Sequence, residues 1–197
     1  MPKYPEKIRD LISGTVRANI LHAGIGLIRE AGWSAFTTER IAERAGVSRG
    51  VLYNYFANKE AIARSILDAS LREQNRQLAE LAARTGPASG KLRAMAAFLL
   101  EDFLDQRELH HIVIAHLPPP GHAGTPPPVE LLNERDAIFG GVLAEGNRNG
   151  EFAVADPAAA VLLLRGGLHE LCMRSFFDGR TPEIRPLIDI FLKGIGC

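Results

Sequence analysis

Residues 37 to 59 contain two short helical patterns separated by a glycine, and this arrangement constrains the fold more than any other feature of the chain. Thr37 is placed to cap the first helix, and Gly46 stands where a helix end favours positive φ. Ser48 then serves as a second N-cap. Apolar residues follow each cap at helical spacing: Ile41, Ala42 and Ala45, then Val51, Leu52 and Tyr55 or Phe56. The sequence predicts a helix, a tight turn and a second helix.

A helix-turn-helix of this kind puts the N-terminal part of its second helix into the major groove of DNA. In this chain that part would present Ser48, Arg49, Gly50 and Tyr53. The same spacing also fits an αα-hairpin inside an all-helical core. The spacing alone therefore leaves both interpretations open.

The distribution of charge favours the first interpretation. The net charge is zero over 197 residues, which by itself argues against a nucleic-acid binder. Residues 1 to 67, however, carry ten Lys or Arg and six Asp or Glu, whereas residues 68 to 197 carry thirteen and seventeen. Such asymmetry is typical of a DNA-facing head on a separate body, with a chance fluctuation as the alternative. The 46% hydrophobic content is ample for a core.

The block G-V-S-R-G-V-L-Y-N-Y-F-A-N-K-E-A-I at residues 46 to 62 resembles the signature of the TetR family of one-component repressors. Residues 19 to 45 resemble the first and second helices of that family, including Gly32, Trp33 and Thr37. The resemblance covers residues 15 to 67, about a quarter to a third of the chain. The remainder resembles the family only in being helical and of the expected length.

Two departures from the family pattern weaken the local helices slightly. Gly24 and Gly26 lie inside the first helix, where each costs about 1 kcal/mol relative to alanine. Arg40 occupies the position where a capping box would have Glu or Gln.

The resemblance implies an all-α fold with a three-helix, helix-turn-helix DNA-binding domain at residues 1–67. Residues 68–197 would form a helical bundle for effector binding and dimerisation. The implied function is that of a transcriptional repressor that binds a palindromic operator as a homodimer and is released by a small, mostly apolar effector. The competing hypothesis is an all-helical enzyme or small-molecule carrier whose head only resembles a DNA reader.

The DNA contacts are assigned by the resemblance and by side-chain chemistry. Arg49 is the predicted base reader, because its planar fork can pair with O6 and N7 of guanine. Hydroxyl, ammonium and amide groups around it are predicted to bind phosphates or base edges, and Gly50 and Val51 to approach the groove closely. For Tyr55, simple packing is an equal alternative. The predicted DNA-binding set is Thr37, Thr38, Ser48, Arg49, Gly50, Val51, Tyr53, Asn54, Tyr55 and Lys59.

Helical patterns continue on both sides of this motif. A basic arm is expected over residues 1 to 13, a first helix over 14 to 31, and a long helix from Asn58 to just before Thr85. Further helices are expected over 129 to 148, 157 to 177 and 182 to 194, after a proline-rich surface loop at 118 to 128. Residues 158 to 164 are apolar nearly all round, which predicts burial on more than one face. In the family the last two helices pair into a dimer interface, so residues 157–194 are predicted to dimerise; the centre of a single subunit is the alternative.

Aromatic, aliphatic and histidine side chains recur on three segments of the body and predict an effector pocket, although core packing explains the aromatics equally well. The predicted pocket residues are Phe98, Leu99, Phe103, His110, Phe139, Leu143 and His169. His110, His111, His116 and His122 lie close in sequence, but no histidine pair has the i, i+4 spacing of a helical zinc site. Neither a metal nor another cofactor is therefore predicted.

The remaining features predict a cytoplasmic protein without catalytic machinery. Cys172 and Cys197 fit neither a zinc site nor a disulfide framework, and Cys172 is expected to be a small buried hydrophobe. No run of about 18 apolar residues occurs, so no membrane contact is expected. The chain also lacks a nucleophile elbow and a phosphate-binding glycine loop.

Overall fold

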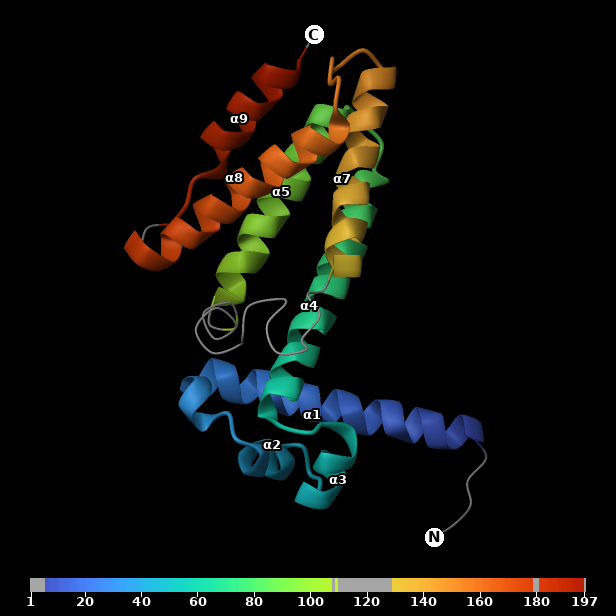
Figure 1. Ribbon diagram of the computed structural model, residues 1–197, viewed down its shortest axis with the longest axis vertical. Helices are drawn as coiled ribbons and strands as arrows, with labels where there is room; N and C mark the ends of the chain where they lie inside the picture. The colour runs from blue at the N-terminus through green and yellow to red at the C-terminus, as the bar shows by residue number, and fades with distance from the viewer. Residues whose placement is uncertain (1–5, 108, 110–128, 179–180, 197) are drawn as a thin grey trace. The chain divides into compact units, whose positions relative to one another are not determined.

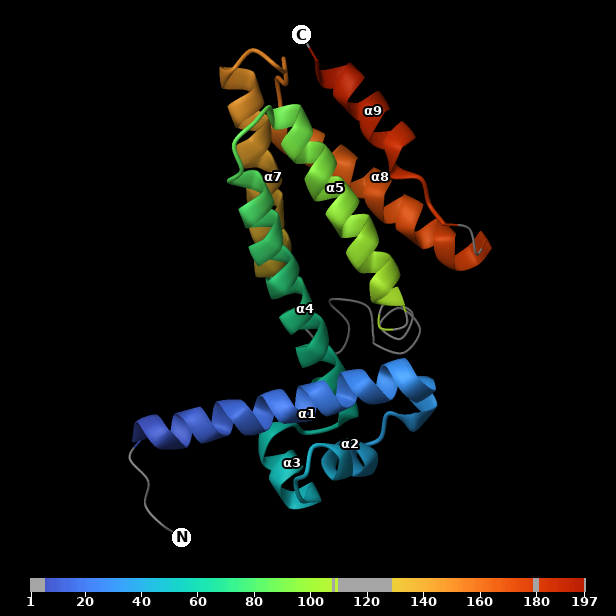
Figure 2. The same ribbon diagram turned by 180° about the vertical axis from the view of Figure 1, so that it is seen from behind.

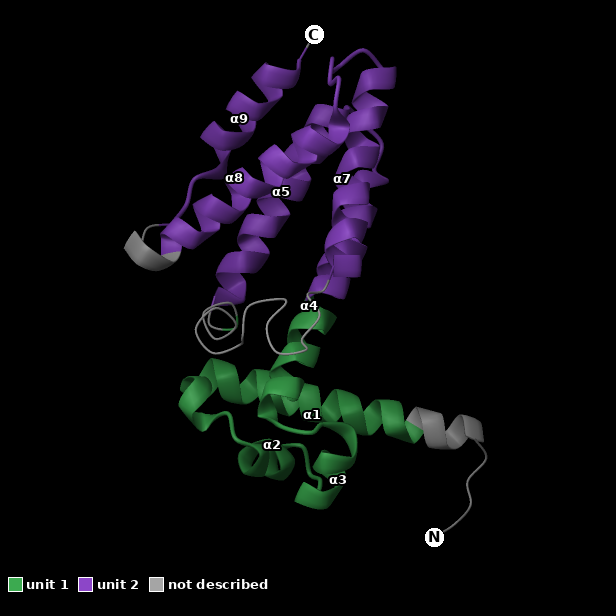
Figure 3. Cartoon of the chain, in the orientation of Figure 1, with its two compact units in different colours: residues 1–70, 108–119 green, residues 71–107, 120–197 purple. Residues whose placement is uncertain are grey.

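The computed structural model describes residues 6–107, 109, 129–178 and 181–196, and every named element within them is a helix. The all-α class is thereby confirmed. The chain divides into two compact units (Figure 3): unit 1 comprises residues 1–70 and 108–119, and unit 2 comprises 71–107 and 120–197. No helix in the described ranges is long and apolar enough to cross a membrane.

Four helices precede the loop at Gly86, and four more are described after it (Figure 1). Unit 1 contains α1, α2 and α3, and α4 contributes its first part to unit 1 and its remainder to unit 2. The other helices belong to unit 2. Their bounds are α1 Glu6–Ala35, α2 Thr38–Arg44, α3 Arg49–Tyr55, α4 Lys59–Ala82, α5 Ala88–Asp105, α7 Val129–Arg148, α8 Pro157–Asp178 and α9 Ile184–Ile195.

The predicted caps of the helix-turn-helix are present. The Thr37 hydroxyl accepts a hydrogen bond from the Arg40 amide at 3.3 Å, and the Ser48 hydroxyl accepts one from the Val51 amide at 3.2 Å. Gly46 has φ = 67°, the left-handed conformation expected of it. These three local signals account for the start and the end of α2 and for the start of α3.

The first helix is longer than predicted. It begins at Glu6 rather than near residue 14, so the expected basic arm is wrong from residue 6 onward. Pro2 and Pro5 lie upstream of this start, and no proline interrupts the charged and aliphatic residues that follow. At the other end, Gly32 adopts φ = 67° and ψ = −169° and breaks the helical conformation, close to the predicted end at residue 31.

The two glycines that weaken α1 locally allow close packing in unit 1. A β-carbon at Gly24 would lie 3.0 Å from both Ile66 Cδ1 and Phe36 Cε2. One at Gly26 would lie 2.6 Å from a guanidinium nitrogen of Arg44. Glycine lowers helix propensity at these two positions, but it lets Ile66 of α4 and the side chains of Phe36 and Arg44 pack closely against α1.

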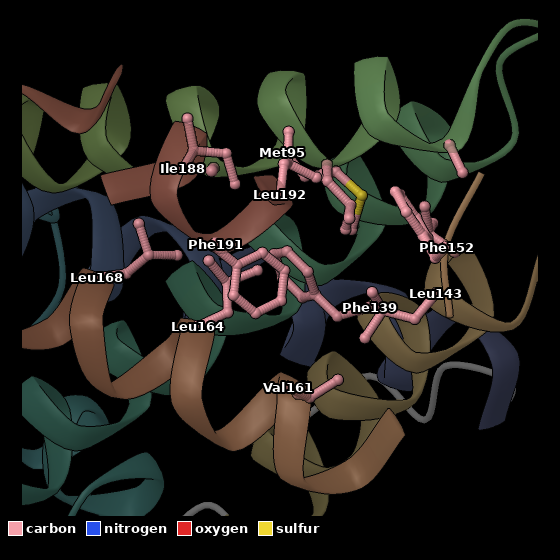
Figure 4. Close-up of a cluster of buried hydrophobic side chains, with 14 of the residues drawn as sticks. Met95, Phe139, Leu143, Phe152, Val161, Leu164, Leu168, Ile188, Phe191 and Leu192 are labelled. Carbon is pink, nitrogen blue, oxygen red and sulfur yellow. The ribbon is translucent and has the colours of Figure 1, made fainter. Parts of the chain in front are cut away.

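Unit 2 is held together by one large apolar cluster to which all five of its helices contribute (Figure 4). Figures 1 and 2 show α8 and α9 beside α5, with α7 next to α5 and α4. The side chains converge between these helices and are almost fully buried. They include Leu78 of α4, Leu92 and Met95 of α5, Phe139 and Leu143 of α7, Leu164 and Leu168 of α8, and Ile188, Phe191 and Leu192 of α9.

Two glycines of α7 give a matched test of this packing. A β-carbon at Gly146 would lie 2.0 Å from the buried ring of Phe152, whereas one at Gly141 would meet no neighbouring heavy atom within 4 Å. We expect Gly146→Ala to lower the free energy of unfolding by about 1 to 3 kcal/mol through overpacking. Gly141→Ala should raise it by up to about 1 kcal/mol through helix propensity. Urea denaturation followed by circular dichroism measures both, and equal effects of the two substitutions would contradict the packing described.

Candidate functional site

The helix α3 buries one edge and exposes a polar face. Leu52 is fully buried and Phe56, just after the helix, is 4% exposed. Val51 and Tyr53, on either side of Leu52, are 36% and 46% exposed. All the predicted contact residues of this segment except Tyr55 lie on the exposed face: Ser48, Arg49, Gly50, Val51, Tyr53 and Asn54.

Tyr55 differs from its neighbours because it is partly buried and packs against the apolar core of unit 1. For this residue the structure favours the packing interpretation. The core that holds it also contains Phe36, Ile41 and Ile62, each completely buried. The buried edge of α3 thus packs on an apolar core, which leaves the opposite face exposed.

Two polar contacts join α2 to α3 on the exposed face. Arg49 Nη2 lies 2.6 Å from Glu39 Oε1, and the Tyr53 hydroxyl lies 3.2 Å from Thr38 Oγ1. Hydrogen bonding to Thr38 and then to Arg49 lowers the pKa of the Tyr53 phenol. The pKa of Arg49 is raised, first by its hydrogen bond with Tyr53 and then by the charge of Glu39. These four side chains therefore form one connected polar group.

A surface hollow of about 270 Å³ lies beside this group. Four residues of the predicted DNA-binding set line it: Thr37, Thr38, Tyr53 and Lys59. The full lining is Thr37, Thr38, Glu39, Tyr53, Ala57, Asn58, Lys59 and Glu60. Donors suited to an anion thus share the hollow with the carboxylates of Glu39 and Glu60.

Lys59 is held at the start of α4 by an aromatic side chain. Its ammonium nitrogen lies 4.3 Å from the centroid of the Trp33 ring, which stacks on Phe36 at 5.1 Å. Asn58 caps the same helix, since its side-chain oxygen accepts a hydrogen bond from the Ala61 amide at 2.8 Å. A cation–π contact thus helps to position the ammonium.

Comparison with known proteins agrees with this geometry. Residues 20–66 match the family described as "Bacterial regulatory proteins, tetR family". The matched segment includes most of α1, all of α2 and α3, and the beginning of α4. Over this segment, about a quarter of the chain, the protein is similar to the tetR family.

Individual curated relatives match part of the chain. An HTH-type transcriptional regulator BetI from Cronobacter sakazakii is 32% identical over 96 residues, which are 48% of this chain and 46% of the relative. A tetracycline repressor protein class G from Vibrio anguillarum is 37% identical over 59 residues, 30% of this chain and 28% of the relative. The chain thus spans less than half the length of these two curated relatives.

A similarity of fold to solved structures extends over most of the chain. The crystal structure of the transcriptional regulator FadR from Bacillus subtilis in complex with stearoyl-CoA superposes with a TM-score of 0.69 at 22% identity. The match covers 89% of this chain and 95% of that one. At this identity the similarity concerns the fold of the body.

The predicted effector residues do not gather in one place in unit 2. Phe139 and Leu143 belong to the large apolar cluster, whereas Phe103 packs with Leu100 and Cys172 in a separate small one. Phe98 and Leu99 are partly buried against the large cluster, and His169 is exposed on α8. Phe98 also lines a surface hollow of about 610 Å³ together with residues of α4. His110 lies outside the described residues.

Sequence reasoning missed a buried polar network between α4, α5 and α7. Gln74 and Asn75 are 5% and 2% exposed. The amide of Asn75 donates to the Leu131 carbonyl at 2.8 Å and accepts from Arg135 at 3.1 Å. Gln74 donates to Asp102 and accepts from Arg135. Burial lowers the pKa of the Arg135 guanidinium.

A signal for this network was present in the sequence. The apolar stripe of α4 runs through Leu71 and Leu78, and Gln74 and Asn75 occupy the core-facing positions between them. Polar side chains at such positions must find buried partners, so they indicate a hydrogen-bonded network between helices.

The other predictions about reactive groups concern Cys172 and the histidines. Cys172 is 9% exposed, and burial raises the pKa of its thiol to about 11, as expected of a structural cysteine. No group of three or more metal-ligating side chains is found in the described part of the chain. His111, His116 and His122, like Cys197 and the proline-rich loop, lie outside it.

Proposed function

We propose that this protein is a transcriptional repressor that binds an operator through α3. The observation that carries this proposal is the exposed polar face of α3, with Arg49 in its first turn and Leu52 completely buried behind it. A helix enclosed inside a helical core would bury this face as well, whereas a surface helix leaves it free for a partner. The αα-hairpin interpretation is therefore disfavoured.

The chemistry of the face fits the major groove. Arg49 offers a planar pair of donors for the O6 and N7 atoms of guanine. Thr37, Thr38, Tyr53 and Lys59 line one hollow, and their side chains carry donors from which a backbone phosphate could accept. In this division of roles, Arg49 recognises a base, and phosphate binding in the hollow fixes the orientation of the protein on the DNA.

We further propose that the protein acts as a homodimer through α8 and α9. Leu162 and Leu163 of α8 and Ile190 of α9 are 59%, 71% and 73% exposed in the single chain, so unit 2 does not bury these apolar side chains itself. Such faces commonly mark protein interfaces. A β-carbon at Gly166 or Gly194 would meet no atom of the chain within 4 Å, which leaves room for close approach by a second helix. Gly167 instead faces Leu187 of its own chain.

A palindromic operator follows from such a dimer. Twofold symmetry would present two copies of α3, and these would engage half-sites one helical turn of DNA, or a multiple of it, apart.

The effector is proposed to bind in unit 2 and to be mostly apolar. The FadR structure from Bacillus subtilis holds stearoyl-CoA, and the fold of this body resembles it. Phe98, Leu99, Phe103, Phe139 and Leu143 would provide apolar walls, with His110 and His169 as polar contacts. The α4 helix belongs to both units, so a ligand that shifts it would change DNA affinity. Such coupling typically amounts to about 1 to 3 kcal/mol.

Fluorescence anisotropy with labelled duplexes tests the proposal. Duplexes tiled across the region upstream of the protein's own gene should include at least one that binds more tightly than a scrambled duplex of equal length. Specific affinity typically exceeds non-specific affinity by at least about 10³-fold. Uniform binding to every duplex would reject the proposed function.

Arg49→Ala and Lys59→Ala should separate base reading from phosphate binding. Arg49→Ala is expected to weaken operator binding by about 1 to 3 kcal/mol and to relax preference at one position in each half-site. Lys59→Ala should weaken operator and scrambled duplex alike, and reduce the slope of log affinity against log salt by about one. If Arg49→Ala kept the same base preference in each half-site, Arg49 would be excluded as the base reader. If Lys59→Ala kept the same salt slope, the proposed phosphate contact of Lys59 would be excluded.

Leu163→Glu and Leu168→Glu test the dimer as a matched pair on one helix. Leu163 is 71% exposed, so a glutamate there should dissociate the dimer while the chain stays folded. Leu168 is 7% exposed inside the core of unit 2, so the same charge there should unfold unit 2. Analytical ultracentrifugation and circular dichroism measure the two effects. A wild-type chain that sediments as a monomer at micromolar concentration would refute the interface.

An effector of the proposed class should act on stability and on DNA binding together. Hydrophobic compounds that raise the melting temperature, as ligands of the folded state do, should also release the operator duplex in the anisotropy assay. Compounds that stabilise the protein and leave operator affinity unchanged would contradict the proposed regulation.

A further inference from the structure

The contact between Glu39 and Arg49 places a carboxylate on the proposed DNA-binding face. Glu39 Oε1 lies 2.6 Å from Arg49 Nη2, and the two side chains are 52% and 60% exposed. Glu39 lies in the first turn of α2, so the ion pair bridges the two helices of the motif. A carboxylate repels the polyanionic backbone of DNA and so weakens binding. Its presence on this face therefore calls for a compensating role.

The surroundings of Glu39 indicate what it does. It lines the same hollow as Thr37, Thr38, Tyr53 and Lys59, the groups proposed to bind phosphate. A phosphate that approached the Arg49 guanidinium would meet the negative charge of Glu39, which is already paired with it. A guanine edge, in contrast, is uncharged and needs only the outer donors of the Arg49 fork.

We propose that Glu39 is a specificity-determining residue, which holds the Arg49 guanidinium in position for a guanine edge and disfavours its use as a non-specific phosphate contact. This inference rests on the proposed function and deepens it. Because arginine carries five donors, one nitrogen can stay paired with Glu39 while others reach the base. Fixing the fork in advance also reduces the side-chain entropy that base reading would otherwise cost.

The neighbouring contact between Tyr53 and Thr38 also supports a positioning role for Glu39. The Tyr53 hydroxyl is 3.2 Å from Thr38 Oγ1, and Tyr53 lies one helical turn after Arg49. Arg49 is therefore flanked by an anionic group from α2 and a phenol from its own helix. Removing the charge of Glu39 leaves the phenol in place and frees the guanidinium to follow any nearby phosphate.

The test compares Glu39→Gln with Glu43→Gln. Both substitutions remove one negative charge from α2, and Glu43 is also exposed, but only Glu39 pairs with Arg49. Anisotropy titrations use three duplexes: the operator, the operator with the guanine read by Arg49 replaced in each half-site, and a scrambled duplex. Circular dichroism melts verify that each variant is folded.

Glu39→Gln is expected to bind the scrambled duplex more tightly and to lower the preference for guanine by roughly two- to fivefold, the range reached by exposed ion pairs. Glu43→Gln should raise the affinities for the operator and for the guanine-replaced operator by similar factors, and so leave the preference for guanine unchanged. In the Arg49→Ala background, Glu39→Gln should no longer change the preference.

Identical behaviour of Glu39→Gln and Glu43→Gln, or an effect of Glu39→Gln that persists without Arg49, would overturn the inference while leaving operator binding intact. If the wild-type chain has no preferred duplex at all, the proposed function and the inference fall together.

Discussion

The burial of Leu52 determines which side of α3 faces solvent, and the rest of the candidate site depends on it. The helix has only seven residues and is too short to be stable alone. Its conformation therefore depends on the caps and on packing against the apolar core formed by α1, α2 and α4. With Leu52 inside, Val51 and Tyr53 on either side of it lie outside. A polar substitution at Leu52 would affect the site without touching any proposed DNA contact.

The local features of unit 1 could be predicted from the sequence because each has a local cause. Thr37 and Ser48 cap their helices, Gly46 has positive φ, and Gly32 interrupts α1 near its expected end. The bounds of α4, α7 and α8 also agree closely with the predicted ranges. These signals depend on a few residues of sequence and on backbone chemistry, so no tertiary information is needed to read them.

Contacts between distant residues could not be predicted in the same way. Gly24 and Gly26 count as weaknesses of a helix until their neighbours Ile66 and Arg44 are known. The Glu39–Arg49 pair depends on the angle at which α2 and α3 meet, which periodicity does not specify. In unit 2, the repeated aromatic spacing fitted a pocket and a core equally well. Phe139 and Leu143 lie in the core, so the apolar set predicted for the effector is partly structural.

The central claim is that two copies of α3 read a symmetric DNA site, and selection from a random duplex pool tests it most directly. The full-length chain would be incubated with the pool at near-physiological salt, and bound duplexes would be recovered, amplified and sequenced over several rounds. The account predicts enrichment of an inverted repeat whose half-sites are centred one helical turn, or a multiple of it, apart. Enrichment of no sequence, or of a motif without twofold symmetry, would contradict it.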